Sequence, residues 1–156
     1  MYTPPLPRKR VPLALILVVD DEPDLLALLV DQLSSLGYDV VAARDGTEGL
    51  RLALDQTPDV ILTDVIMPYM DGPEMLERMR SRPETRDIPV IALTALTDRR
   101  TRSRLTALGV RSFLAKPYTM RDLADRIREA ISPSSWADPA TEAAKRPPSL
   151  PPRTRR

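Results

Sequence analysis

The sequence predicts an α/β protein built on a doubly wound, five-stranded parallel sheet. Five short apolar runs recur between residues 14 and 131, and segments with helical periodicity separate them. Most of the runs are continuously apolar and rich in Val, Ile and Leu, which is typical of strands that helices cover on both faces. Five alternating strand and helix units favour one doubly wound sheet, and such sheets bind ligands at the carboxyl ends of their strands.

The five apolar runs give the expected strands. Each run is short, as strands usually are, and a helical pattern follows it. We expect strands at residues 14–19, 38–43, 60–63, 90–94 and 112–115.

The first expected helix carries a leucine-rich stripe. An apolar residue at every third or fourth position is expected where a helix packs one face against a sheet. Gly37 ends this helix, because glycine readily adopts the left-handed conformation that closes many helices. The stripe comprises Leu25, Leu26, Leu29, Val30, Leu33 and Leu36.

The other four helices begin at capping residues. Asp45 and Asp71 each stand three residues before a glutamate, which is the spacing of a capping box. The fourth helix is expected over residues 98–108. Thr119 is expected to cap the fifth. The apolar face of that fifth helix comprises Leu123, Ile127 and Ile131.

Disordered tails are expected on both sides of a single folded domain, residues 13–132. Residues 1–12 contain four prolines and residues 133–156 contain six. Proline interrupts helices and strand ladders, and segments this poor in apolar surface cannot offset the entropy of ordering. Each tail has a net charge of +3, which leaves −5 for the domain between them. An acidic domain does not suit nucleic acid, so we expect no nucleic-acid partner.

Two residue types are missing from the sequence. Without cysteine there can be no disulfide or thiolate metal site, and without histidine there can be no imidazole catalysis. Arg8-Lys9-Arg10 precedes a short apolar run that contains Pro12, and the run lacks the features of a cleaved signal peptide. No apolar stretch approaches the roughly 20 residues that cross a bilayer. We therefore expect a cytoplasmic protein without a membrane partner.

Polar residues stand at the carboxyl ends of four expected strands. Asp20 and Asp21 follow the first strand, and Asp64 follows the third. Thr94 ends the fourth strand, and Lys116 follows the fifth. Because parallel strands end at the same edge of a sheet, we expect these five side chains to converge on one crevice.

The three carboxylates of this crevice predict a cation site. Carboxylates packed together repel unless a cation or a shared proton intervenes. Mg²⁺ suits the site, because it is held by one or two carboxylates plus waters and readily shares a phosphate oxygen; Mn²⁺ could take its place. Lys116 would add a mobile positive charge and Thr94 a hydroxyl donor for the other phosphoryl oxygens.

Each of these residues also has an ordinary structural interpretation. Asp20 could cap the first helix, and Asp64 could begin the turn that Pro68 continues. Lys116 could be a solvated strand end, and Thr94 a β-branched strand residue. The occurrence of all of them at strand ends favours the functional hypothesis.

Four segments resemble the signature blocks of the bacterial two-component response-regulator receiver family. They read ILVVDDEPDLLALL, DVILTDVIMPYMDG, PVIALTA and FLAKP, and the resemblance covers about residues 14–131. It implies the flavodoxin-like fold of a chemotaxis-regulator-like single-domain receiver, with strand order 2-1-3-4-5 and five flanking helices.

The resemblance also implies a role for each carboxylate. Asp64 would be the phosphoacceptor. Asp21 and Asp64 would bind the metal directly, with Asp20 helping through water. The backbone carbonyl of Ile66 would be a further metal ligand.

Four residues beyond the carboxylates receive implied roles as well. Thr94 and Lys116 would contact the phosphoryl group. Thr94 would then act as a switch together with Phe113, the aromatic residue of the last strand. Lys116-Pro117 matches the family's cis peptide bond, which X-Pro bonds adopt at modest cost.

These roles imply a phosphorylation-dependent signalling switch that is not an enzyme and catalyses only its own phosphorylation and dephosphorylation. The phosphoryl group would come from the phosphohistidine of a sensor histidine kinase or of a histidine phosphotransfer protein. The surface made by the fourth helix, fifth strand and fifth helix would change and control an unidentified partner. A phosphorylation-dependent homodimer is also compatible with these roles.

Haloacid-dehalogenase-type phosphatases offer an alternative from another functional class. They too use a strand-end aspartate nucleophile, a lysine and magnesium acids, but they carry a second aspartate two residues after the nucleophile as general acid. Ile66 occupies that position here and cannot transfer a proton.

Two basic regions have open interpretations. The arginines of the fourth helix, Arg99, Arg100, Arg102 and Arg104, could form a solvated face or a docking surface for an acidic partner. The basic tails could contact nucleic acid, although no recognisable binding motif accompanies them.

Overall fold

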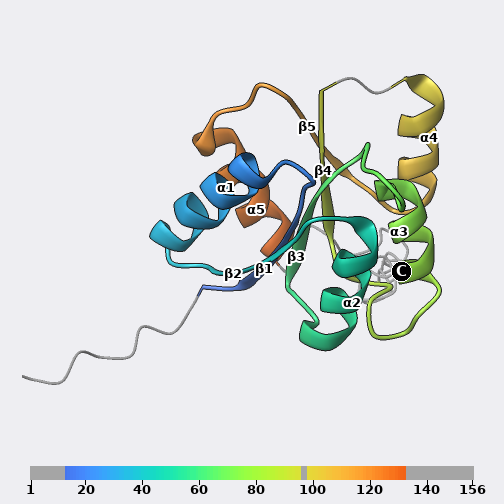
Figure 1. The fold of residues 1–156 in the computed structure, drawn as a ribbon, viewed down its shortest axis with the longest axis horizontal. Coiled ribbons are helices and arrows are strands. Elements are labelled where there is room, and N and C mark those ends of the chain that lie inside the picture. Colours follow the sequence, from blue (N-terminus) through green and yellow to red (C-terminus); the bar gives the residue numbers. More distant parts are fainter. Residues whose placement is uncertain (1–12, 96–97, 133–156) are drawn as a thin grey trace, which may run out of the picture.

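The computed structural model describes residues 13–95 and 98–132, and its fold is the predicted doubly wound α/β sheet (Figure 1). Five parallel strands lie in the order β2-β1-β3-β4-β5. The strands are β1 Leu15–Val19, β2 Asp39–Ala43, β3 Val60–Asp64, β4 Val90–Thr94 and β5 Ser112–Ala115. The helices are α1 Pro23–Ser35, α2 Gly46–Gln56, α3 Gly72–Arg80, α4 Arg99–Ala107 and α5 Met120–Ile131. The tails predicted for residues 1–12 and 133–156 lie outside the described residues.

Strand bounds differ from the predicted runs at three ends. Ala14 and Tyr38 are buried but precede their strands, whereas Asp64 is the last residue of β3 and pairs with Leu93 of β4. A strand therefore fixes the backbone of Asp64, although the predicted apolar run ended one residue earlier.

Helices cover both faces of the sheet, as Figure 1 shows, with α1 and α5 on one face and α2, α3 and α4 on the other. The face covered by α1 and α5 has a largely aliphatic core that includes Ile16, Leu29, Leu62, Ile91 and Ile127. The opposite core includes Leu17, Ile61, Met67, Met70, Met75, Met79 and Leu105. Among the described residues, no helix is long and apolar enough to cross a bilayer.

Capping residues begin four of the five helices. The side chains of Asp45, Asp71, Asp98 and Thr119 accept hydrogen bonds from the backbone N–H three residues later, at 2.8, 2.9, 2.6 and 3.1 Å. These bonds satisfy N–H groups that lack a partner within the helix. Gly37 follows α1 in the left-handed region, with φ +99°. The placement of Leu36 on the buried stripe is wrong, because this residue lies beyond the last turn of α1 and is 46% exposed.

Arg80, at the end of α3, connects three backbone carbonyls. Its Nε donates to the carbonyl of Leu108 at 2.9 Å, and its Nη1 donates to the carbonyls of Arg86 and Ile88 at 2.5 and 2.9 Å. Burial lowers the pKa of this guanidinium. Arg80 therefore joins the end of α4 to the segment that leads into β4.

Candidate functional site

The carboxyl ends of β1 and β3 bring three aspartates together. One carboxylate oxygen from each of Asp20, Asp21 and Asp64 lies within 4.8 Å of the others. The strands are neighbours whose last paired residues are Val19 and Thr63, so the residues that follow emerge side by side. Asp20 is buried, Asp64 is partly buried and Asp21 is exposed. The crevice is therefore open to solvent on the Asp21 side.

Asp20 divides its two oxygens between the backbone and the crevice. Its Oδ1 accepts a hydrogen bond of 2.9 Å from the Glu22 N–H. Its Oδ2 is buried, has no hydrogen-bond partner among the described residues, and lies 3.9 Å from the Lys116 Nζ. Burial raises the pKa of this carboxyl, while the Glu22 N–H and the Lys116 charge lower it. The local turn and the crevice thus use different atoms of the same side chain.

Asp64 is arranged in the same way. Its Oδ1 accepts a bond of 2.7 Å from the Val65 N–H, and its Oδ2 accepts one of 3.2 Å from the Lys116 Nζ. The side chain is 14% exposed. A backbone donor thus orients the carboxylate, and the oxygen that faces Lys116 lies in the crevice.

Lys116 connects the carboxylates to the last two strands. Its Nζ contacts both Asp64 and Asp20, and its side chain is 20% exposed. Its backbone N–H donates to the carbonyl of Thr94 at 2.8 Å, which fixes the end of β4 beside the end of β5. The Lys116-Pro117 peptide bond is cis.

Gly72 allows α3 to begin directly beside Asp64. Its N–H donates to the Val65 carbonyl at 3.0 Å. A Cβ at this position would lie 2.8 Å from the backbone oxygen of Asp64 and 3.2 Å from the Cα of Val65. Backbone atoms cannot move aside as a flexible side chain can, so only glycine fits. The capping pattern of the sequence gave no indication of this contact.

Thr94 and Phe113 point toward the same face of the sheet. Phe113 pairs with Ala92, two residues before Thr94, and side chains two apart along a strand share a face. Thr94 is 7% exposed, and Phe113 is half-buried against the core that α2, α3 and α4 cover. The guanidinium carbon of Arg102 lies 4.6 Å from the centre of the Phe113 ring.

Tyr118 is a residue of this region that the sequence patterns missed. Its hydroxyl is buried and has no hydrogen-bond partner among the described residues. Burial and the charges of Asp20 and Asp64 raise its pKa. The signal that could have identified Tyr118 is its place directly after Lys116-Pro117, in the segment that supplies the lysine of the crevice.

The chemistry of the carboxylates suits a hard divalent cation. Three carboxylates share a small volume, and the buried Asp20 Oδ2 lacks a hydrogen bond within the described part of the chain. A buried carboxylate oxygen of this kind is costly unless a cation or a proton satisfies it. Magnesium, which accepts an all-oxygen ligand set and retains several waters, fits the open side of the crevice.

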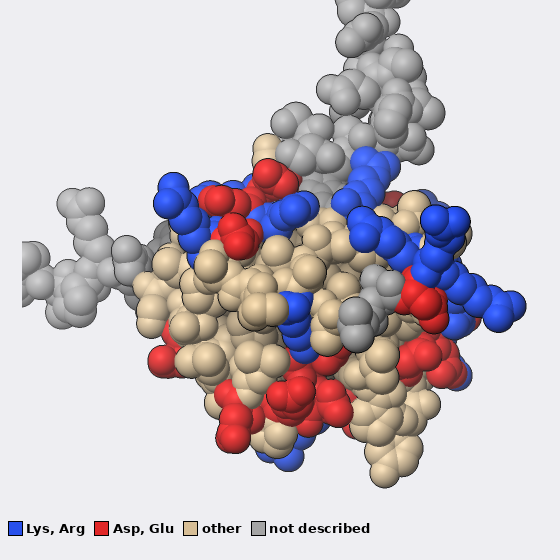
Figure 2. All heavy atoms as spheres, turned by 90° about the horizontal axis from the view of Figure 1, so that it is seen from above, with Lys and Arg blue, Asp and Glu red and all other residues tan. Residues whose placement is uncertain are grey.

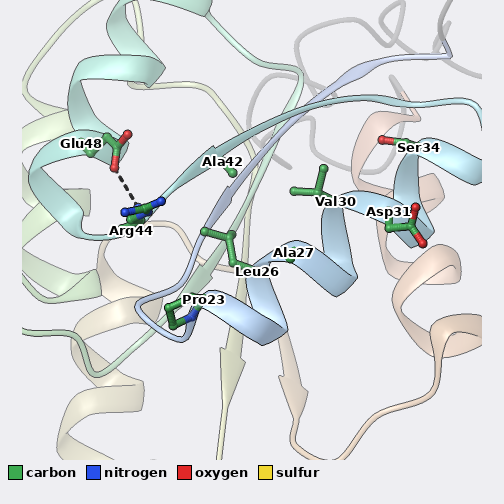
Figure 3. Close-up of a pocket in the computed structure, with 9 residues that line it drawn as sticks. All are labelled: Pro23, Leu26, Ala27, Val30, Asp31, Ser34, Ala42, Arg44 and Glu48. Atoms are coloured by element: carbon green, nitrogen blue, oxygen red, sulfur yellow. Dashed lines mark hydrogen bonds between the residues drawn. The ribbon is translucent and has the colours of Figure 1, made fainter.

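A groove of about 680 Å³ lies apart from the crevice, between α1 and β2 (Figure 3). Leu26, Val30 and Ala42 supply its apolar part, and the Arg44 N–H donates to Glu48 at one end. None of the three clustered aspartates lines it. It is therefore not part of the candidate site.

Comparison with known proteins gives concordant similarities. Residues 16–128 match the family model of the response regulator receiver domain. The chain is 39% identical over 113 residues to hybrid signal transduction histidine kinase D of Dictyostelium discoideum. It is 38% identical over 116 residues to the probable transcriptional regulator ycf27 of Guillardia theta. These alignments cover 72% and 74% of this chain but 7% and 44% of the relatives, so the chain spans less than half of their length.

A solved structure shows the same similarity in three dimensions. The chemotaxis protein CheY4 of Vibrio cholerae matches with a TM-score of 0.71 and 31% sequence identity. The match covers 75% of this chain and 98% of that protein.

Proposed function

Because the chain belongs to the response-regulator receiver family, we propose that its phosphorylation-dependent switching begins at Asp64, as the phosphoacceptor. Receiver domains are signalling domains of two-component systems. The haloacid-dehalogenase alternative has no support among the comparisons, and its general-acid position holds the apolar Ile66. The proposal concerns which residues of this chain perform each step.

One observation carries the assignment of Asp64. Of the three clustered carboxylates, Asp64 combines partial exposure with an oxygen at hydrogen-bond distance from Lys116. Asp20 is 1% exposed and cannot meet a phosphodonor without rearrangement. Asp21 is exposed, and no hydrogen bond from Lys116 reaches it among the described residues. Asp64 is therefore the carboxylate that a donor can approach and that a cation already neutralises.

The chemistry at Asp64 is a phosphoryl transfer. A carboxylate oxygen forms a bond to phosphorus, and the bond between phosphorus and the donor's imidazole nitrogen breaks with its electron pair left on that nitrogen. The Lys116 ammonium offsets negative charge on the transferring group, and the Val65 N–H holds the carboxylate in orientation. Such catalysis consists chiefly of positioning and electrostatic stabilisation.

Receiver domains typically use magnesium at an acidic cluster of this kind. We assign direct ligation to Asp21 and Asp64, ligation through water to Asp20, and a further ligand to the backbone carbonyl of Ile66. When bound, magnesium would supply charge neutralisation at the phosphoryl oxygens.

The response of the domain would begin at Thr94 and Phe113. Their side chains share a face of the sheet, so a movement of Thr94 toward a phosphoryl group would leave space for the Phe113 ring. The surface formed by α4, β5 and α5 would then change and control a downstream partner. The proposed donor is a sensor histidine kinase or a histidine phosphotransfer protein, and a phosphorylation-dependent homodimer is a further possible consequence. Cytoplasmic location and the domain limits 13–132 stay predictions.

The decisive experiment is labelling with a small phosphodonor. Acetyl phosphate and magnesium should label the wild-type chain, and Asp64→Asn should remove the label. The matched control is Asp55→Asn, which makes the same chemical change at an exposed position of α2. Full labelling of Asp64→Asn would refute the assignment, and equal losses in both variants would show a nonspecific effect.

A further inference from the structure

Helix α4 carries an arrangement of charges that works against its own stability. Its nine residues include four arginines and no acidic residue. Arg99 and Arg102 are three positions apart, and Arg100 and Arg104 are four apart, so like charges are neighbours on the helix surface. Arg99 and Arg100 also stand in the first turn, where the helix dipole disfavours positive charge. Charge placements that disfavour a helix in this way are often found at functional sites.

Few of these charges are neutralised within the domain. Arg104 forms an ion pair of 2.7 Å with Glu77 on α3. Among the described residues, no ion pair or hydrogen bond engages the side chain of Arg99 or Arg102. The domain as a whole is acidic, with a net charge of −5. Figure 2 shows basic side chains (blue) gathered on the side of the molecule where α4 lies, with some acidic side chains (red) next to them.

A shallow, open depression lies along this basic part of α4. It has a volume of about 510 Å³, and we call it the α4 groove. Its lining consists of Arg99, Arg102, Ser103, Thr106 and Ala107. Of the residues of α4, only Leu105 is buried, so the lining residues face away from the core. The groove therefore offers two arginines and the Ser103 hydroxyl but no carboxylate, since the Thr106 hydroxyl donates to the backbone carbonyl of Arg102.

Arg102 links the α4 groove to β5. Its guanidinium lies over the Phe113 ring, at 4.6 Å from the ring centre. Stacking on an aromatic face holds the planar guanidinium in place and leaves its N–H groups free to donate. A guanidinium held in this way loses less entropy when it binds a carboxylate.

We propose that the α4 groove binds an acidic segment of a partner protein, and that Arg102 couples its occupancy to the position of the Phe113 ring. Carboxylates of the partner pair with Arg99 and Arg102. The segment binds best while the ring supports Arg102, and phosphorylation weakens binding because the ring then turns inward. By linkage, the bound segment disfavours the phosphorylated conformation to the same extent. This coupling rests on the switch role proposed for Phe113.

Binding is tested first with a fluorescent hexaglutamate peptide at low salt, by anisotropy. The double variant Arg99→Gln/Arg102→Gln should weaken peptide binding roughly fivefold, because each exposed ion pair contributes modestly. The matched control is Arg51→Gln/Arg78→Gln, which removes the same charge from exposed arginines of α2 and α3. The control should bind like wild type.

Three results would overturn the docking surface. One is an equal loss of peptide binding in both double variants, which would indicate only net charge. Another is a short DNA duplex that binds through Arg99 and Arg102 where the peptide does not. The third is a change in self-association alone, seen by light scattering, since that would identify a second copy of the chain as the occupant.

The coupling is tested by repeating the titration with magnesium and beryllofluoride, which mimic the phosphorylated state. The affinity of wild type for the peptide should fall about threefold or more, which corresponds to the lower part of the usual coupling range. Arg102→Lys keeps the charge but cannot stack in the same way, so its affinity should no longer respond. An unchanged wild-type affinity, or an equal response in Arg102→Lys, would refute the coupling.

Labelling by acetyl phosphate and magnesium, in samples of the same proteins without beryllofluoride, separates the two proposals. If Asp64 is not labelled while the peptide still binds through Arg99 and Arg102, the proposed phosphoacceptor fails and the docking surface stands. If Asp64 is labelled and the peptide does not bind, the docking surface fails alone.

Discussion

The two faces of the sheet are packed with different kinds of side chain. The core beneath α1 and α5 consists mainly of leucine, isoleucine and valine, and Met120, the methionine that packs against it within the described residues, is only partly buried. The core beneath α2, α3 and α4 contains Met67, Met70, Met75 and Met79, with Phe113 at its margin. Methionine is flexible and fills irregular space, whereas branched aliphatic residues have few rotamers. The second face is therefore better suited to repacking than the first.

The loops at the crevice follow the same division. Those that lead into α1 and α5 carry Asp20, Asp21 and Lys116, and both of these helices pack on the aliphatic core. The loop that leads into α3 follows Asp64, and Thr94 stands before α4. The loops on one face of the sheet thus carry Asp20, Asp21 and Lys116, and the methionine-rich face lies beside Asp64, the proposed phosphoacceptor, and beside Thr94. Each prediction below tests this division.

The largest expected effect is a difference in stability loss between a cavity variant in α5 and one in α4. Ile127→Ala should lower the free energy of unfolding by about 2–5 kcal/mol, because it leaves a cavity in a fully buried site of α5. Leu105→Ala removes the only buried residue of α4, and we expect a loss below that of Ile127→Ala because the helix can detach. Urea denaturation gives the two free energies.

Amide exchange in the same two variants checks the mechanism. Leu105→Ala should speed exchange throughout α4 and leave α5 protected. Equal unfolding losses with uniform exchange would mean that both helices belong to one cooperative unit, which would contradict the division.

The second effect concerns the contact between α3 and β3. Gly72→Ala should cost about 1–3 kcal/mol of stability, because the new Cβ would meet the Asp64 backbone oxygen at 2.8 Å. The exposed Ser34→Ala, on α1, serves as the control and should change stability by less than about 0.5 kcal/mol. If Gly72→Ala were as stable as wild type, the loop before α3 would be able to move and accommodate the new Cβ, as well as the core that α3 covers.

Third, Asp21→Ala should weaken magnesium binding by at least about tenfold, because too few anionic oxygens remain in the site. Stability should be unchanged or slightly increased, since Asp21 is exposed and its removal relieves carboxylate repulsion. Asp24→Ala removes an acid from the first turn of α1 and is the matched control. Magnesium affinity is measured by following amide chemical shifts during a titration. Equal affinities of the two variants would contradict the prediction.

The smallest effect is expected at Ile66, which is 75% exposed. Ile66→Asn should speed the loss of phosphate from the labelled protein by several-fold, because a polar group there could orient an attacking water. Ile66→Val retains the apolar character and should keep the wild-type rate. Leu96, a second apolar residue that we expect to flank the approach of this water, lies outside the described residues. Equal rates in all three proteins would contradict the expectation that apolar side chains exclude the attacking water.

Local patterns were enough to predict the sheet and the position of its functional edge. Asp20, Asp64 and Lys116 end strands that share a direction, so a topological rule places them together without any knowledge of side-chain contacts. The alternative interpretation of Asp20 as the cap of the first helix is wrong, because Glu22 is the N-cap of α1 and the Asp20 Oδ1 binds the N–H of that residue, before the helix begins. A carboxylate has two oxygens, so this local bond leaves the Asp20 Oδ2 in the crevice.

Contacts between distant segments could not be predicted in the same way. Gly72 appeared only as part of a capping box, and its close approach to Asp64 depends on how α3 packs after β3. No sequence motif identifies Arg80, because its partners are backbone carbonyls, which every residue type has. The contact between Arg102 and Phe113 joins α4 to β5, and the periodicity of either segment does not specify how the helix is placed along the strand.

Arg80 determines how α4 can move. Its bond to the Leu108 carbonyl and the pair between Arg104 and Glu77 fasten the carboxyl end of the helix. At the amino end, which follows the Thr94 strand, the Asp98 cap is the side-chain hydrogen bond found within residues 13–95 and 98–132. The helix can thus rotate about its end at Leu108, and the rise per residue gives a length of about 13 Å from Leu108 to Arg99. A rotation of about 10° about that point carries the Arg99 end, which adjoins the Thr94 strand, through about 2 Å, so a shift of that size beside Thr94 can be accommodated by tilting the whole helix.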